Sequence, residues 1–385
     1  MNPDNWIYGD KVNTVLLDRF KDPKLSRALL ERITRLSEEI AHKQNEQPLA
    51  LMEVCGTHTV AIARSGLRSV LPPNIKLISG PGCPVCVTAN CDIDRIVAAS
   101  RLPDVIITTF GDMMRVPGSS TSLQQRRAEG AKVEVVYSPL DALEVAKKNP
   151  QQQVLFVAVG FETTTPLIAA TLKRAQAAGV ENFSVLTAHK RVTPALDALA
   201  GDPDVALDAL ILPGHVSTIL GVQPYQFLAE QYGIPAVVAG FDPVDLLLAI
   251  AELLSQIHSG KPRIEIAYGR AVQRQGNEAA RAAIDEVFAV ADATWRGLGP
   301  IPHSGHVLRE EYASFDALRR FDLEALTEST VEPKGCKCGE VLRGVMAPNE
   351  CRLFGKVCTP VNPVGPCMVS GEGSCAAYYK YQIGQ

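Results

Sequence analysis

The feature that most restricts the fold of this chain is a series of short apolar runs that alternate with longer helical stretches. The runs cover residues 49–54, 75–79, 105–109, 133–137, 154–159, 184–187, 209–212 and 236–239. Each is almost uninterrupted, as expected for a strand that is buried on both faces of a parallel sheet. Strands that alternate with helices are typical of α/β proteins, because parallel strands need a crossover connection. The pattern therefore predicts an α/β fold with parallel sheets.

Eight strands can form one large sheet or two sheets of four strands. The polar stretch KKNPQQQ between the fourth and fifth runs favours two sheets. We therefore expect two Rossmann-like parallel-sheet α/β domains, over residues 46–145 and 146–260. An amphipathic helix over 24–43 predicts a helical segment at 1–45, packed on a C-terminal domain. That domain covers 261–385, and its end is rich in Gly, Pro and Cys, which predicts irregular structure shaped around a ligand.

The composition argues against several classes of protein. The 385 residues carry 38 Lys and Arg and 42 Asp and Glu, so the formal net charge is −4 and no basic surface for nucleic acid or an anionic membrane is indicated. No apolar run reaches the ~18 residues that a membrane span needs. The N-terminus, MNPDNWIYGD, has neither the basic start nor the apolar core of a secretory signal. We therefore expect a cytoplasmic protein in a reducing compartment.

The ten cysteines fall into two groups at opposite ends of the chain. Four lie between residues 55 and 91, six lie between 336 and 375, and none lies between the groups. In a large cytosolic chain such clusters indicate metal binding or redox chemistry, whereas disulfide frameworks belong to small secreted domains. We therefore predict that these cysteines handle metal and electrons.

The early cysteines follow predicted strands, together with other polar candidates. Cys55 follows the first run, and Cys83 and Cys86 follow the second with two residues between them. Two thiols at this spacing either close a disulfide or share a metal, and a following helix would stabilise a thiolate. Glu162 and His215 each come after a buried strand and a glycine. The carboxyl ends of parallel strands form the usual ligand-binding edge of a sheet, so these five residues are expected to face one cleft.

The C-terminal cysteines predict an iron–sulfur cluster. Cys338, Cys351, Cys358 and Cys375 have the form C-x12-C-x6-C-x16-C, and the first gap is x14 if Cys336 replaces Cys338. Four thiolates are the usual ligands of a [4Fe–4S] cluster, whereas structural zinc sites usually use closely spaced cysteine pairs. The spacing does not decide between Cys336 and Cys338. The remaining thiols, including Cys367, are candidates for a redox-active group beside the cluster.

Five motifs taken together resemble the HypD family of hydrogenase maturation proteins. They are CGTHT at 55–59, GPGCPVC at 80–86, GFETTTP at 160–166, PGHVS at 213–217 and the CxC…C…C…C tail. The resemblance runs from Cys55 to Cys375, almost the whole chain. It implies a redox-active scaffold on which the Fe(CN)2CO group of [NiFe]-hydrogenase is assembled and from which it is transferred.

The resemblance also implies roles for individual residues and for partners. Cys55 would be the ligand of the iron that carries cyanide and carbon monoxide. Cys83 and Cys86 would be the redox-active pair, supported by Glu162 and His215. The tail cysteines would hold the [4Fe–4S] cluster. The implied partners are a HypC-like small chaperone, a HypE-like cyanide donor that carries a thiocyanate and, indirectly, the hydrogenase large subunit.

Two other functions use the same sequence features. A thiol–disulfide oxidoreductase would use the cluster to reduce the Cys83/Cys86 disulfide for a protein substrate, without needing Cys55. A zinc-stabilised binding module would use the tail cysteines for structure alone. Against a nucleotide-binding version of that module, neither G-x-G-x-x-G nor G-x-x-x-x-G-K-[ST] follows any predicted strand.

Overall fold

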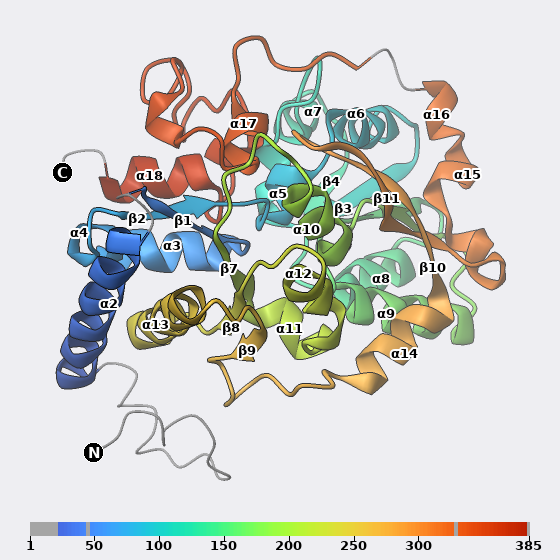
Figure 1. The fold of residues 1–385 in the computed structure, drawn as a ribbon. Coiled ribbons are helices and arrows are strands. Elements are labelled where there is room, and N and C mark those ends of the chain that lie inside the picture. Colours follow the sequence, from blue (N-terminus) through green and yellow to red (C-terminus); the bar gives the residue numbers. More distant parts are fainter. Residues whose placement is uncertain (1–21, 44–46, 327–329, 383–385) are drawn as a thin grey trace.

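The computed structural model describes residues 22–43, 47–326 and 330–382 and contains two parallel sheets (Figure 1). The first sheet has the order β2-β1-β7-β8-β9, with β1 (Leu49–Glu53), β2 (Ile75–Ser79), β7 (Ala209–Pro213), β8 (Ala236–Ala239) and β9 (Ile264–Ile266). The second has the order β4-β3-β5-β6, with β3 (Val105–Thr109), β4 (Val133–Val135), β5 (Gln153–Ala158) and β6 (Phe183–Thr187). All neighbours within each sheet are parallel. The predicted α/β class with two parallel sheets is confirmed.

The second sheet is inserted between two strands of the first. The chain builds β1 and β2, leaves to form β3 to β6, and returns with β7, which pairs with β1 in the register Leu51↔Ala209. This division differs from the predicted domains at 46–145 and 146–260, since β5 and β6 join β3 and β4 while β7 to β9 join β1 and β2. Apolar runs identify buried strands, but they do not show which strands become neighbours.

The first sheet is covered on its outer face by two long helices. The helices of this part are α2 (Pro23–Lys43), α3 (Gly56–Ser65), α4 (Leu67–Val70) and α13 (Pro243–Ser259). Alternate strand residues such as Leu51 and Ile211 face α2 and α13, because successive side chains of a strand point to opposite faces. The main packing partner of α2 is α13, and Ala267 packs against the same apolar cluster, whereas the prediction placed this helix on the C-terminal domain. Residues 1–21 and 44–45 of the predicted segment 1–45 lie outside the described part of the chain.

Capping residues fix the ends of α13. The side chains of Asp242 and Asp245 cap its first turn reciprocally, with Pro243 as the first helical residue. Gly260, with φ +63, ends the helix in the left-handed conformation that glycine adopts without a Cβ clash. None of the described helices combines the length and apolar character that crossing a membrane requires.

Helices also cover both faces of the second sheet. They are α6 (Asn90–Ala99), α7 (Leu123–Ala128), α8 (Pro139–Lys148), α9 (Thr165–Ala177), α10 (Val192–Ala200) and α14 (Glu278–Val287). Helices α8, α9 and α14 share one apolar core with that sheet. Residues of α6, α7 and α10 share a larger core, to which inward residues of both sheets contribute, such as Met52 and Ile107. This core joins the two sheets into one molecule.

The chain after the sheets is an antiparallel hairpin followed by an irregular Cys-rich segment. The hairpin consists of β10 (Phe288–Trp295) and β11 (Gly299–Leu308). The other helices in the part of the chain that the structure describes are α5 (Pro84–Val87), α11 (Gly214–Leu220), α12 (Gln226–Glu230), α15 (Ala317–Phe321), α16 (Leu323–Leu326), α17 (Cys338–Leu342) and α18 (Ser374–Gln382). The 3-10 turns within the described residues are η3 (Gly111–Arg115), η4 (Gln223–Tyr225), η5 (Glu310–Phe315), η6 (Pro348–Glu350) and η7 (Pro366–Met368). Thus 261–385 contributes a strand to the first sheet, a hairpin and the predicted irregular Cys-rich part.

Candidate functional site

Cys55 and the Cys83/Cys86 pair lie on two adjacent turns. Because β1 and β2 are parallel neighbours, the turns that follow them start at the same edge of the sheet. The amide of Gly56 donates to the carbonyl of Gly82 over 3.0 Å. A Cβ atom at Gly82 would overlap the backbone of Cys55, so only glycine allows this approach. The prediction that these cysteines share one cleft stays a prediction, but the backbones of their turns are in contact.

Cys83 and Cys86 form a disulfide bond at the start of α5, with their Cα atoms 5.2 Å apart. Cys83 is the N-cap of this helix, and its sulfur accepts a hydrogen bond from the Cys86 amide over 3.2 Å. Both residues are buried. Of the two uses that the spacing left open, shared metal or disulfide, the structure has the disulfide.

Cys55 is a buried thiol at the N-cap of α3. Burial raises its pKa to about 11, and the nearby carboxylate of Glu372 adds to this increase, while backbone hydrogen bonds from His58 and Thr57 oppose it. The thiol therefore keeps its proton at neutral pH unless a cation takes the place of that proton. A buried thiol of this kind suits a soft metal ion, which binds the thiolate and releases the proton.

Glu162 is a buried carboxyl group on the turn after β5. One oxygen, Oε1, accepts a hydrogen bond from the Val192 amide over 2.9 Å, whereas Oε2 has no partner among the described residues. Burial raises its pKa to about 7, partly offset by the backbone hydrogen bonds. Near neutral pH this side chain can therefore both donate and accept a proton.

His215 lies in the first turn of α11, directly after β7, and is exposed. Its ring stacks on Phe241 with the ring centroids 4.0 Å apart, and burial lowers its pKa. The same phenylalanine contacts His58, with centroids 4.7 Å apart. His58 is fully buried, and its Nε2 lies 3.0 Å from the Gly240 carbonyl oxygen, so this histidine ties the Cys55 turn to the end of β8.

The structure adds two residues to this region that the sequence analysis did not single out. Glu372 accepts a hydrogen bond from the Thr57 hydroxyl over 2.8 Å, and its charge acts on both Cys55 and His215. Tyr225 is fully buried; burial raises its pKa, a hydrogen bond with Ser217 opposes this increase, and the Glu162 carboxylate adds to it. Neither residue belongs to a strand-end motif, so no spacing signal marks it.

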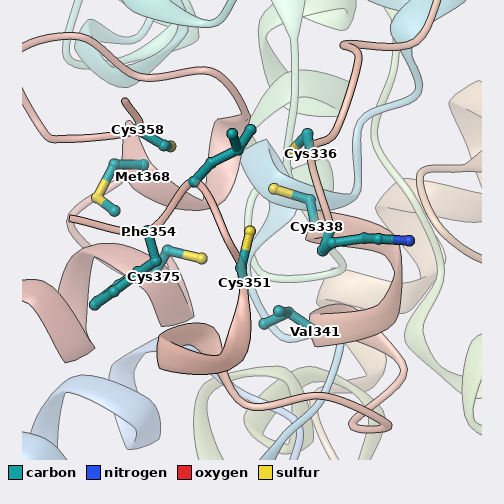
Figure 2. Close-up of a pocket in the computed structure, with 10 residues that line it drawn as sticks. Cys336, Cys338, Val341, Cys351, Phe354, Cys358, Met368 and Cys375 are labelled. Atoms are coloured by element: carbon teal, nitrogen blue, oxygen red, sulfur yellow. The ribbon is translucent and has the colours of Figure 1, made fainter. Parts of the chain in front are cut away.

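Five of the tail cysteines line one pocket (Figure 2). They are Cys336, Cys338, Cys351, Cys358 and Cys375. Figure 2 shows the thiols of Cys338, Cys351 and Cys375 pointing toward the same central space. The sixth tail cysteine, Cys367, is completely buried, and its thiol hydrogen-bonds with those of Cys338 and Cys375. The neighbouring thiol of Cys338, and then that of Cys367, lower the pKa of Cys375.

The donor set of this pocket fits a [4Fe–4S] cluster. Among the described residues, no three His, Cys, Asp or Glu side chains converge in a way that could hold a single metal ion. A cubane cluster does not require such convergence, because each of its four irons takes a different thiolate. The amide of Val364 points at the Cys358 sulfur over 3.4 Å, a hydrogen bond of the kind that tunes cluster sulfurs.

One short segment connects the pocket with the disulfide. Gly365 lies so close to the pocket that a Cβ atom there would be 2.5 Å from the Cys336 sulfur and 2.6 Å from that of Cys338. The next residue, Pro366, has its carbonyl oxygen 3.9 Å from the Cys86 sulfur. Residues 365–367 therefore touch tail cysteines and the Cys83–Cys86 disulfide at once.

The second sheet also holds this part of the chain in place. Arg115, in η3 after β3, donates to the carbonyl oxygens of Pro360 over 3.0 Å and Val369 over 3.1 Å. The hydroxyl of Ser370 donates to Asp112 of the same turn over 2.8 Å. The Cys-rich segment is thus fixed against strand ends of both sheets.

A family model described as "HypD: Hydrogenase formation hypA family" matches residues 29–382, nearly the whole chain. The chain belongs to the HypD family. It is 46% identical to the hydrogenase maturation factor HypD of Rhodobacter capsulatus over 94% of this chain and 97% of the relative. It is 43% identical to the factor of the same name from Escherichia coli, over 95% and 98%. A putative hydrogenase expression/formation protein of Methanocaldococcus jannaschii is 45% identical over 94% and 98%.

Proposed function

We propose that this HypD-family chain acts in hydrogenase maturation as a redox-active scaffold that assembles and transfers the Fe(CN)2CO group. Membership of the family and the names of its relatives support the maturation role. The observation that carries the redox part is segment 365–367, which contacts the cysteine pocket on one side and the Cys83–Cys86 disulfide on the other.

In this proposal the iron is cargo, and Cys55 is its ligand. Low-spin iron that carries cyanide and carbon monoxide prefers soft thiolate donors. The buried Cys55 thiol provides one, and a cysteine of a HypC-like small chaperone provides a second. A HypE-like protein brings cyanide as a thiocyanate, and the hydrogenase large subunit receives the completed group. All of these assembly steps take place in the cytoplasm.

The cysteine pair supplies both electrons that the release of cyanide requires. A Cys83/Cys86 dithiol supplies two electrons and two protons to the thiocyanate of the donor, breaking its S–C bond. The products are the donor thiol, hydrogen cyanide and the Cys83–Cys86 disulfide. Hydrogen cyanide releases its proton when the carbon binds iron, and Glu162, with its pKa near 7, is suited to accept it. A [4Fe–4S] cluster held by Cys351, Cys358, Cys375 and one of Cys336 and Cys338 would supply one-electron reducing equivalents when bound.

A thiol–disulfide oxidoreductase is the second candidate, favoured by the same disulfide and pocket. It would reduce a disulfide of a protein substrate and would need neither Cys55 nor iron in the cleft. A zinc-stabilised module would need neither iron nor labile sulfide, so metal analysis distinguishes it from both redox functions.

Infrared spectroscopy tests the scaffold directly. The protein is purified anaerobically together with its small chaperone, and the region between the protein and water bands is recorded. We expect sharp cyanide and carbon monoxide bands, because their metal-bound stretching modes fall where protein does not absorb. The bands should disappear in Cys55→Ala and persist in Cys91→Ala, which removes a half-buried thiol outside both cysteine sites.

The opposite outcome is equally clear. If the wild-type complex has an intact cluster and an intact chaperone interface but shows neither band, the scaffold proposal fails. Disulfide reductase activity that survives in Cys55→Ala would then favour the oxidoreductase.

A further inference from the structure

Exposed cations lie on the segments of chain that line the tail-cysteine pocket. Lys334, Lys337, Arg352 and Lys356 are all exposed, and we call them the basic rim. Residues 333–361 contain five basic and two acidic side chains, in a chain whose formal net charge is −4. This segment is therefore positively charged, although the molecule as a whole is negatively charged.

Contacts with Leu353 connect the chain segments that carry these cations to the pocket. Leu353 lines the pocket, and Gly335 lies against it, with a Cβ position 3.6 Å from Leu353 Cδ1. Lys334 and Arg352 are the sequence neighbours of these two contacting residues. The amide of Lys356 donates to the Leu353 carbonyl oxygen over 3.2 Å. Lys337 itself lines the pocket.

Most of this charge is uncompensated. Lys337 pairs with Glu340 over 2.5 Å, but Lys334, Arg352 and Lys356 form no ion pair with any other described residue. The second carboxylate of the segment, Glu350, accepts a hydrogen bond from the Ala347 amide. Next to Lys356, the side chain of Val357 is 55% exposed. Exposed cations beside an exposed apolar side chain complement an acidic protein surface.

We propose that the basic rim docks an acidic one-electron carrier protein that reduces this chain. The inference rests on the proposed function, which consumes two electrons each time the cysteine pair returns to the disulfide. Two reduced carriers give one electron each, and with two protons from solvent they convert the Cys83–Cys86 disulfide into two thiols. Cys336 and Cys351 are partly exposed within the rim, so a carrier seated there is close to the pocket thiols.

The primary test measures binding and needs no turnover. An oxidised plant-type [2Fe–2S] ferredoxin, which is small and acidic, serves as the probe and is titrated against the full-length protein at low and high salt. We expect salt-sensitive binding that weakens about tenfold or more in the triple variant Lys334→Glu, Arg352→Glu, Lys356→Glu, because rim charges govern electrostatic association.

A matched variant controls for net charge. Lys148→Glu, Arg174→Glu and Lys261→Glu change the net charge by the same amount at exposed positions on α8, on α9 and after α13. Figure 1 shows these helices away from α17 and its neighbouring loops. This variant should bind ferredoxin like the wild type. Equal weakening in both triple variants, or none in either, overturns the proposal, as does binding that is insensitive to salt.

A second readout separates this inference from the proposed function. Photoreduced 5-deazariboflavin, an uncharged reductant, should generate the two thiols equally fast in the wild type and in both triple variants. Reduced ferredoxin should do so about tenfold more slowly only in the basic-rim variant. If deazaflavin generates the two thiols but ferredoxin does not reduce even the wild type, only the docking proposal fails and the proposed redox function stands. If deazaflavin also fails, the proposed redox function fails with it.

Discussion

At the scale of single residues, Glu162 is the clearest case of a group whose environment conflicts with its charge. Its side chain is fully buried, and one carboxyl oxygen has no partner among the described residues. Burial favours the protonated form, which is why its pKa rises to about 7. The folded protein therefore binds this proton more tightly than the unfolded chain does.

This difference makes stability depend on pH in a defined direction. A carboxyl whose folded pKa lies above its unfolded value stabilises the fold below the unfolded pKa, and that contribution is lost as pH rises through 7. Glu162→Gln keeps the acceptor for the Val192 amide and cannot ionise. Between pH 5 and pH 8 the wild type should lose about 2.5 kcal/mol of unfolding free energy relative to this variant. Urea unfolding at both values measures it, and parallel pH profiles would contradict it.

Gly365 provides a steric test of the cysteine pocket. A methyl group there would occupy space that the Cys336 and Cys338 sulfurs fill, at 2.5 and 2.6 Å. Gly365→Ala should therefore lose most of its iron and labile sulfide while its circular dichroism stays native. Gly371→Ala is the control, because a Cβ at Gly371 meets nothing within 4 Å. Similar iron contents in the two purified variants would show that the pocket does not hold the cluster.

Sequence reasoning at this scale located residues on turns but not their contacts. It placed Cys55, Cys83 and Glu162 after buried strands, where the structure also has them. It did not find Tyr225 or Glu372, because both act across elements that are distant in sequence. A strand end can be predicted from a local pattern, whereas a contact such as Thr57 to Glu372 depends on the whole fold.

At the scale of elements, the tip of the β10–β11 hairpin joins the disulfide helix to the cysteine pocket. Arg296 is buried at this tip; its Nε donates to the Thr88 carbonyl over 3.0 Å and its Nη2 donates to Asn90 Oδ1 over 3.1 Å. Gly297, with φ +82, lies against Gly339, so that a Cβ at Gly297 would overlap the residue after Cys338. The hairpin thus fixes α5, α6 and α17 relative to one another.

Removing the Arg296 guanidinium should loosen this junction. Arg296→Met keeps an apolar side chain of similar length but leaves the Thr88 carbonyl and the Asn90 side chain without their buried donor. Each unsatisfied buried group costs roughly 1–3 kcal/mol, so we expect a loss of about 2–4 kcal/mol in unfolding free energy. The comparison is Arg319→Met, whose side chain is 60% exposed and whose ion pairs contribute about 1 kcal/mol or less. Equal urea midpoints would refute the role of Arg296.

The hairpin also marks where local sequence patterns become ambiguous. The pattern predicts a helix over 277–290, but α14 ends at Val287 and β10 starts at Phe288. Alanines occupy alternate positions of β10, and alanine favours helices, so propensity and alternation disagree there. The eight apolar runs carry no such conflict, and every one of them forms a strand within one or two residues of its predicted ends.

At the scale of the whole molecule, the order of strands within the sheets could not be deduced from the sequence. Runs that are buried on both faces look alike. No local pattern therefore shows that β1 pairs with β2, 26 residues further along the chain, and also with β7, 158 residues further along. The polar stretch at 147–153 suggested a domain boundary, yet it runs from the end of α8 to the first residue of β5, within the part of the chain that builds the second sheet. Pairing of β1 with β7 is decided by the global packing of two shared cores.

The insertion of the second sheet between β2 and β7 has a consequence for synthesis on the ribosome. Strand β1, which ends next to Cys55, leaves the ribosome early, but its neighbour β7 is synthesised more than 150 residues later. The strands β3 to β6 are contiguous, so they can assemble while the first sheet is still incomplete. The turn that carries Cys55 is therefore among the first parts of the chain to be made and among the last to be finished. In the proposed function this order would keep cargo from loading onto a partly made protein.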